Sequence, residues 1–116
     1  MDTLRISISE LHPGDFPKKS SWDFFSSFPD VRFQQEYAYT PFGICLLEGV
    51  GNILMEGSHR VARLSEVGVS QIYYFRRELT GKDIKLWQQR INALHSKRIY
   101  NFDDFLNQCQ SGRFYR

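Results

Sequence analysis

Residues 43–55 read GICLLEGVGNILM and carry the signal that decides the fold. The unbroken apolar run at 44–47 is typical of a strand that is buried on both faces. Gly49-Val50-Gly51-Asn52 then predicts a turn, and residues 53–55 continue the apolar pattern into a partner strand. We therefore predict a hairpin here. We do not interpret its Gly-x-Gly as a phosphate-binding loop, because it lies between two strands and not before a helix.

Further strands are predicted on both sides of this hairpin. Residues 4–9 alternate apolar and polar side chains, and residues 31–39 do the same with an aromatic face. Residues 59–64 form a fifth predicted strand, bounded by a Gly-Ser turn. Residues 69–79 fit either a strand or a helix; we favour the strand because aromatic and β-branched side chains suit it.

Three helices are predicted from caps and apolar stripes. Ser20 caps a short helix over 21–28, which Pro29 ends. Thr80 and Asp83 have the spacing of a capping box before a helix over 82–96. Asn101 caps a last helix, which Gly112 stops. The apolar stripes of these two C-terminal helices are Ile84, Trp87, Ile91 and Leu94, and then Phe102, Phe105, Leu106 and Cys109.

These elements predict a single α+β domain over residues 1–116. Its expected architecture is one curved antiparallel sheet, a meander of four to six strands, with a short N-terminal helix and two C-terminal helices. A small β-barrel capped by helices is the alternative. Residues 10–19, which contain two prolines and a glycine, are expected to be a loop, and residues 113–116 a C-terminal tail that docks on the domain or on a partner.

Composition excludes several classes of protein. Hydrophobic residues make up 41% and charged residues 24%, which excludes general disorder. No apolar run is long enough to span a membrane, so we expect no membrane partner. The two cysteines, at 45 and 109, are expected to be reduced core residues of a cytoplasmic protein, because the start of the chain resembles no secretion signal.

The sequence carries no recognised motif for catalysis, cofactor binding or metal binding. The sequence contains no G-x-x-x-x-G-K-[ST], G-x-S-x-G, C-x-x-C or H-x-x-x-H pattern, so we expect no enzyme activity, no cofactor and no metal. One enzymatic hypothesis is retained. His59, Arg60, Arg63 and Tyr73 could share a sheet face and cleave RNA, although an exposed His59 beside a turn is the simpler interpretation. His95 is expected to be a partly buried packing residue, and His12 carries no signal.

Charge and aromatic residues concentrate toward the C-terminus. Residues 1–58 hold four Lys/Arg against eight Asp/Glu, and residues 59–116 hold eleven against five, so the halves carry −4 and +6. Ten Phe, six Tyr and two Trp amount to 16% of the chain. Aromatic and cationic side chains in sequence stack bases and contact phosphates, and they also dominate protein–protein hot spots. The candidate contact residues are Tyr73, Tyr74, Arg76, Arg77, Lys82, Lys85, Arg90, Lys97, Arg98, Arg113 and Tyr115.

Three functions are therefore expected, in this order. The first is a non-enzymatic binding protein, such as an inhibitor, adaptor or assembly subunit, which engages a protein partner or a second copy through the basic, aromatic C-terminal half. The second is a nucleic-acid-binding protein that uses the same basic face. The third is a small nuclease-like enzyme. A compact domain without catalytic signatures is also compatible with an accessory protein of a phage or mobile element.

Overall fold

A five-stranded sheet and five α-helices make up the part of the chain that the computed structural model describes, residues 4–115. Arg116, the end of the predicted tail, lies outside the described residues. The elements in chain order are β1 (Leu4–Ser7), a 3₁₀ turn η1 (Ile8–Glu10), β2 (Leu11–His12), α1 (Lys19–Ser26), α2 (Asp30–Tyr37), β3 (Phe42–Leu47), β4 (Gly51–Leu54), α3 (Ser58–Glu66), β5 (Gln71–Arg76), α4 (Gly81–Ser96) and α5 (Phe102–Gln110).

The predicted hairpin is confirmed. β3 and β4 pair antiparallel, with Ile44 opposite Leu54 and Leu47 opposite Gly51. Gly49 and Gly51 have φ angles of 83° and 111°, left-handed values that favour glycine, so the turn depends on both residues. Every residue of β3 is buried except Leu46, which agrees with the prediction of a strand covered on both faces.

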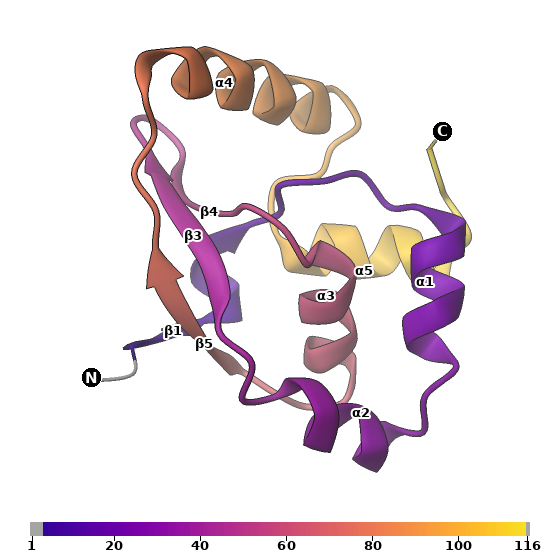
Figure 1. The fold of residues 1–116 in the computed structure, drawn as a ribbon. Helices are drawn as coiled ribbons and strands as arrows, with labels where there is room; N and C mark the ends of the chain where they lie inside the picture. Colours follow the sequence, from indigo (N-terminus) through magenta and orange to yellow (C-terminus); the bar gives the residue numbers. More distant parts are fainter. Residues whose placement is uncertain (1–3, 116) are drawn as a thin grey trace.

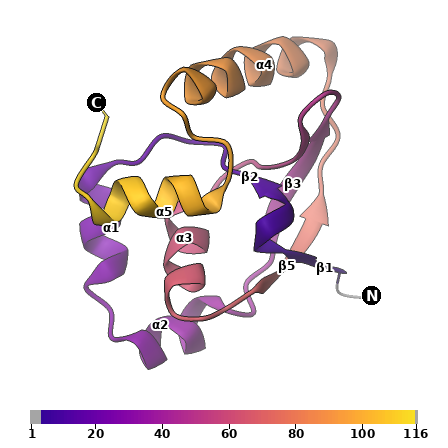
Figure 2. The same ribbon diagram turned by 180° about the vertical axis from the view of Figure 1, so that it is seen from behind.

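The sheet is mixed, so the prediction of an antiparallel meander is wrong in part. The strand order is β1-β5-β3-β4-β2. β1 pairs antiparallel with β5, whereas β5 runs parallel to β3 and β2 runs parallel to β4. The physical reason is α3, which connects β4 to β5 and returns the chain to the other edge of β3 in a parallel direction. The resulting sheet is curled, with β2 and β1 at its two edges (Figures 1 and 2).

Two of the predicted strands are helices. Residues 31–39 fall mostly in α2, where the rings of Phe33 and Tyr37, four residues apart, lie 4.8 Å from each other on one helical face. Residues 59–64 fall in α3, in which Val61, Ala62 and Leu64 are buried against the sheet and neighbouring helices. In each segment the side chains that alternate in sequence also satisfy a helical period, and tertiary packing selects the helix.

The other helix and strand predictions hold in part. The strand predicted over 4–9 ends at Ser7 and is followed by η1, and the loop predicted over 10–19 contains β2, because Leu11 and His12 pair with β4. The ambiguous segment at 69–79 contains β5. The capping box of Thr80 and Asp83 starts α4, and the Asn101 side chain accepts a hydrogen bond from the Asp104 N–H at 2.9 Å at the start of α5. The first helix, α1, begins earlier than predicted, after Lys18, and no side chain caps it.

Helix α3 occupies the centre of the helical layer. It packs against α1, α2 and α5, and all four helices lie on the same side of β3 and β5 (Figures 1 and 2). Helix α4 lies apart at one end of the sheet, where Trp87 approaches Gly14 and Leu54. Within residues 4–115, no helix has the length and apolar character required to cross a membrane.

Candidate anion site at the start of helix α3

The first turn of α3 has three backbone N–H groups with no hydrogen-bond acceptor among residues 4–115, as at other helix starts. Gly57 precedes the helix with a φ of 91°, and its carbonyl accepts the Val61 N–H at 2.9 Å. In the described part of the chain, the structure records no acceptor for the N–H groups of Ser58, His59 and Arg60. Unpaired N–H groups and the helix dipole give a helix N-terminus a partial positive charge. This end of α3 is therefore suited to an anion.

The side chains of Ser58 and His59 hold the loop at 13–18 against α3. Ser58 Oγ accepts the Gly14 N–H at 3.3 Å, and His59 Nε2 accepts the Lys18 N–H at 2.9 Å. Both side chains are buried, and the His59 imidazole lies edge-on to Phe105 with centroids 5.1 Å apart. Both contacts use side-chain atoms, so they do not occupy the backbone N–H groups of the same two residues.

His59 is neutral in this arrangement. Burial lowers its pKa from 6.5 to about 4, and the nearby Lys18 charge acts in the same direction while Asp15 opposes it. A neutral ring whose Nε2 accepts a hydrogen bond carries its proton on Nδ1. The sequence-based interpretation of His59 as an exposed strand residue is therefore wrong, because the residue is buried in a helix.

The Arg60 guanidinium lies over the start of the helix. A Cβ atom added to Gly57 would come 2.8 Å from Arg60 Nη2 and 3.0 Å from Phe42 Cδ1, so the guanidinium packs directly against the glycine backbone. Its Cζ atom lies 5.1 Å from the centroid of the Phe42 ring, a cation–π contact that holds it there. A cation is thus held beside free N–H groups that already favour negative charge.

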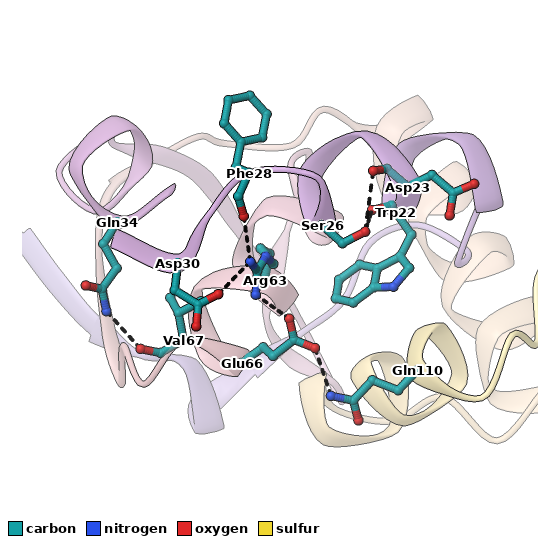
Figure 3. A network of polar contacts seen from close by, with 10 residues as sticks. All are labelled: Trp22, Asp23, Ser26, Phe28, Asp30, Gln34, Arg63, Glu66, Val67 and Gln110. Carbon is teal, nitrogen blue, oxygen red and sulfur yellow. Dashed lines mark hydrogen bonds and ion pairs between the residues drawn. The ribbon is translucent and has the colours of Figure 1, made fainter. Parts of the chain in front are cut away.

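Arg63 has a structural role and is not available to a ligand. Its side chain is 7% exposed, and Nη2 donates to the Phe28 carbonyl and to Asp30 Oδ1, each at 2.8 Å. Nη1 donates to Glu66, which in turn accepts a hydrogen bond from Gln110 at 2.9 Å (Figure 3). The network ties α3 to α5 and to the segment between α1 and α2. The hypothesis that Arg63 shares a sheet face with Tyr73 is therefore wrong.

The contact residues predicted from the sequence lie on several surfaces. On β5, Tyr73 belongs to one face of the sheet, whereas Tyr74 and Arg76 belong to the other, with Arg76 Cζ 5.7 Å from the Tyr74 centroid. Arg76 and Arg77 border a groove of about 950 Å³ between the β3–β4 turn and α4. The other predicted cations are exposed on α4, after it, or in the tail: Lys82, Lys85, Arg90, Lys97, Arg98 and Arg113.

Two of these cations and the tail pack within the domain. Arg90 lies 4.9 Å over the Trp87 ring, and Lys97 lies 5.5 Å over the Tyr115 ring. The Tyr115 N–H donates to the Pro17 carbonyl at 3.0 Å, and its ring meets Phe16 edge-on. The described part of the tail therefore docks beside the loop at 13–18 that borders the start of α3.

Sequence reasoning missed the start of α3. The sequence does contain a signal for this helix, because Ser58 is a suitable residue for a helix start and Gly68 is a suitable residue for a helix end. In the structure Gly68 follows the last turn with a φ of 95°. In the sequence, the Gly57-Ser58 pair instead indicates a turn before a strand. The clustering of Arg60, Phe42 and the loop at 13–18 depends on tertiary packing and has no signal in the sequence.

Comparison with known proteins gives structural likeness only. No protein-family model matches the chain, and no curated protein does. A conserved hypothetical protein from Pyrococcus furiosus is similar over 67% of this chain, with a TM-score of 0.52 and 16% identity, and the chain spans 33% of its length. Sulfiredoxin from Arabidopsis thaliana is similar over 76% of this chain and 98% of its own, with a TM-score of 0.54 and 11% identity.

The chromosome-partitioning protein ParB from Caulobacter crescentus, C-terminally truncated and complexed with CTP-γ-S, is also similar. The likeness covers 84% of this chain and 54% of that chain, with a TM-score of 0.52 and 11% identity. At these identities the comparisons establish a shared fold, namely an α+β domain built on a mixed, curled sheet.

Proposed function

We propose that this domain binds the phosphate groups of a nucleotide at the start of α3. The observation that carries the proposal is the unpaired N–H groups of Ser58, His59 and Arg60 beside the Arg60 guanidinium. A helix N-terminus binds phosphate through such N–H groups and through its dipole. An arginine adds charge and paired donors that match phosphate oxygens.

The surroundings of the helix start support the same ligand class. Lys18 is exposed on the loop that Ser58 and His59 hold against α3. Its ammonium lies 3.6 Å from Asp15, an exposed ion pair that contributes little stability and can exchange for a phosphate contact. Lys18 is therefore a second cation, besides Arg60, on the segments that meet at the start of α3.

The choice of nucleotides over other anions rests on the fold comparison. The Caulobacter ParB structure that shares the fold is complexed with CTP-γ-S, an analogue of a nucleoside triphosphate. Nucleoside triphosphates are therefore the ligands to test first. The partner-binding role that the sequence predicts involves other residues, mainly on β5 and α4, and stands beside this proposal.

The test is calorimetric titration of the full chain with CTP and with ATP, each with Mg²⁺, and with cytidine as a ligand without phosphates. We expect a triphosphate to bind and cytidine not to bind. Arg60→Gln should weaken triphosphate binding about tenfold, the effect of losing roughly 1.4 kcal/mol of a charge-assisted contact. Arg113→Gln, at an exposed arginine after α5, is the matched control and should leave binding unchanged.

Two results would contradict the proposed function. The first is the absence of binding by either triphosphate to a folded wild-type chain. The second is binding that Arg60→Gln leaves unchanged, because the site would then lie elsewhere.

A further inference from the structure

Along β1 and β5, one face of the sheet is aromatic and no helix covers it, whereas the same face at β3 carries the buried Cys45 and Leu47 and contacts α4. Tyr73 and Phe75 are two residues apart on β5, so their side chains point to the same side of the sheet. In Figure 1, β1 and β5 run along the left of the molecule and α1, α2, α3 and α5 lie to their right, so one side of these two strands is free of helices. Figure 2 agrees from behind.

Two of the aromatic rings on this face are open to solvent. Tyr39, in the turn after α2, is 75% exposed, and Phe75 is 46% exposed. Tyr73 contacts Tyr39 with ring centroids 5.9 Å apart and a tilt of 35°. We call Tyr39, Tyr73 and Phe75 together the aromatic face.

Arginines border the aromatic face. Arg5 is paired directly with Tyr73 across β1 and β5, and its Cζ atom lies 5.8 Å from the Tyr73 centroid. A Cβ atom added to Gly43 would meet both Arg77 Cδ and Phe75 Cζ at 3.3 Å, so the Arg77 and Phe75 side chains lie side by side over this glycine. Arg5 thus lies beside Tyr73, and Arg77 lies beside Phe75.

The charge of the face favours an anionic partner. The positions of β1, β5 and β3 that share the face with Tyr73 and Phe75 include Ser7, Gln71 and Gly43, all of which are neutral. Arg5 and Arg77 are exposed. Open aromatic rings with arginines beside them are the combination with which proteins hold single-stranded nucleic acids, since bases stack on the rings and phosphates contact the cations.

We propose that the aromatic face binds single-stranded nucleic acid, with bases stacked on Tyr39 and Phe75 and phosphates at Arg5 and Arg77. A duplex is excluded from this mode because its bases are already stacked on one another. The face lies on the opposite side of the sheet from Phe42, against which Arg60 packs, so this binding is independent of the nucleotide site.

The test is fluorescence anisotropy of labelled oligothymidylate and oligouridylate with the full chain, beside a labelled duplex of matched length. We expect single strands to bind more tightly than the duplex, with an affinity that falls as salt rises. Phe75→Ala and Tyr39→Ala should each weaken single-strand binding about fivefold or more. Arg5→Gln should reduce the steepness of log K plotted against log salt concentration by about one, because it removes one phosphate contact.

A matched control is available on α1. Phe24 is 57% exposed but lies on the helical side of the molecule, so Phe24→Ala should not alter binding. Arg60→Gln should also leave single-strand binding unchanged, which separates failure here from failure of the nucleotide site. Circular dichroism of each variant verifies that it is folded.

The proposal is overturned by any of three results. One is no single-strand binding at low salt, and another is binding that neither Phe75→Ala nor Tyr39→Ala weakens. The third is self-association of the chain that Phe75→Ala abolishes, because this would assign the aromatic face to a second copy of the protein.

Discussion

His59 Nε2 accepts the backbone N–H of Lys18 at 2.9 Å, and together with the Ser58–Gly14 contact it holds the loop at 13–18 to the first turn of α3. The contact exists only while the imidazole is neutral at Nε2. The start of α3 and the loop beside it are therefore held together by a buried, uncharged histidine.

The first prediction is that the free energy of unfolding decreases as the pH is lowered, because of His59. Its pKa of about 4 in the folded protein is below 6.5, so the unfolded chain binds the proton more tightly. The stability that the neutral His59 contributes is therefore fully present above pH 6.5 and is lost as the pH falls toward 4. At pH 4 the loss amounts to roughly 3 kcal/mol. Urea denaturation at several pH values measures it.

His59→Gln provides the comparison, because glutamine has no proton to gain in this range. Its free energy of unfolding should depend less on pH between 6.5 and 4 than that of the wild type. Parallel pH profiles for the two proteins would disprove this account of His59.

The second prediction concerns a pair of histidines. His12 Nδ1 lies 2.6 Å from the Pro13 carbonyl, so it donates, and His12 Nε2 is left to accept from His95 Nε2 at 2.9 Å. Burial lowers the pKa of His12, and the neighbouring His95 lowers it further, while the Pro13 carbonyl and Asp104 oppose the shift. An NMR titration should show His12 protonated at Nδ1 and titrating below pH 6.5. A value above 6.5 would contradict the hydrogen-bond assignment.

The third prediction compares two glycines. A Cβ atom at Gly14 would come 2.0 Å from the Leu54 carbonyl oxygen and 2.9 Å from the Trp87 ring, whereas at Gly81 it would meet nothing within 4 Å. Gly14→Ala should therefore lower the free energy of unfolding by about 3 kcal/mol or more, since backbone must move. Gly81→Ala, in the first turn of α4, should be neutral or slightly stabilising. Thermal denaturation of both variants checks the contrast.

The fourth prediction separates the two partners of one ion pair. Arg63 is 7% exposed, whereas Asp30 is 73% exposed. Arg63→Ala should destabilise the protein by about 3 kcal/mol, because it removes packing and leaves the Phe28 carbonyl without its donor. Asp30→Asn should cost less than about 1 kcal/mol, as is usual for an exposed partner. Equal losses in chemical denaturation would show that the ion pair, and not the arginine, stabilises the segment.

Local signals in the sequence predicted the parts of the fold that local chemistry decides. The glycines at 49 and 51 specified the hairpin, and Thr80 and Asn101 specified two helix starts. The segment at 31–39 failed because Phe33 and Tyr37 fit both a period of two and a helical period, and only packing of α2 against α3 decides between them.

Long-range features were not predictable in the same way. The parallel pairing of β3 with β5 can be predicted only when residues 59–64 are recognised as part of α3. The sequence pattern of these residues indicates a strand instead, so the sequence does not predict this pairing. The proposed nucleotide site depends on backbone N–H groups, which every residue except proline has, so only the helix start itself could have drawn attention to it. The hydrogen bond between His12 and His95 joins residues 83 apart and has no local signal.

The measurement that tests the central claim most directly is an NMR titration of the ¹⁵N-labelled full chain with CTP and Mg²⁺. The account predicts saturable shifts of the backbone amide signals of Ser58, His59 and Arg60, with those of exposed residues on α4, such as Gln89, unchanged. If these three signals do not move while the ligand binds, or if no signal moves at all, the start of α3 is not a phosphate site.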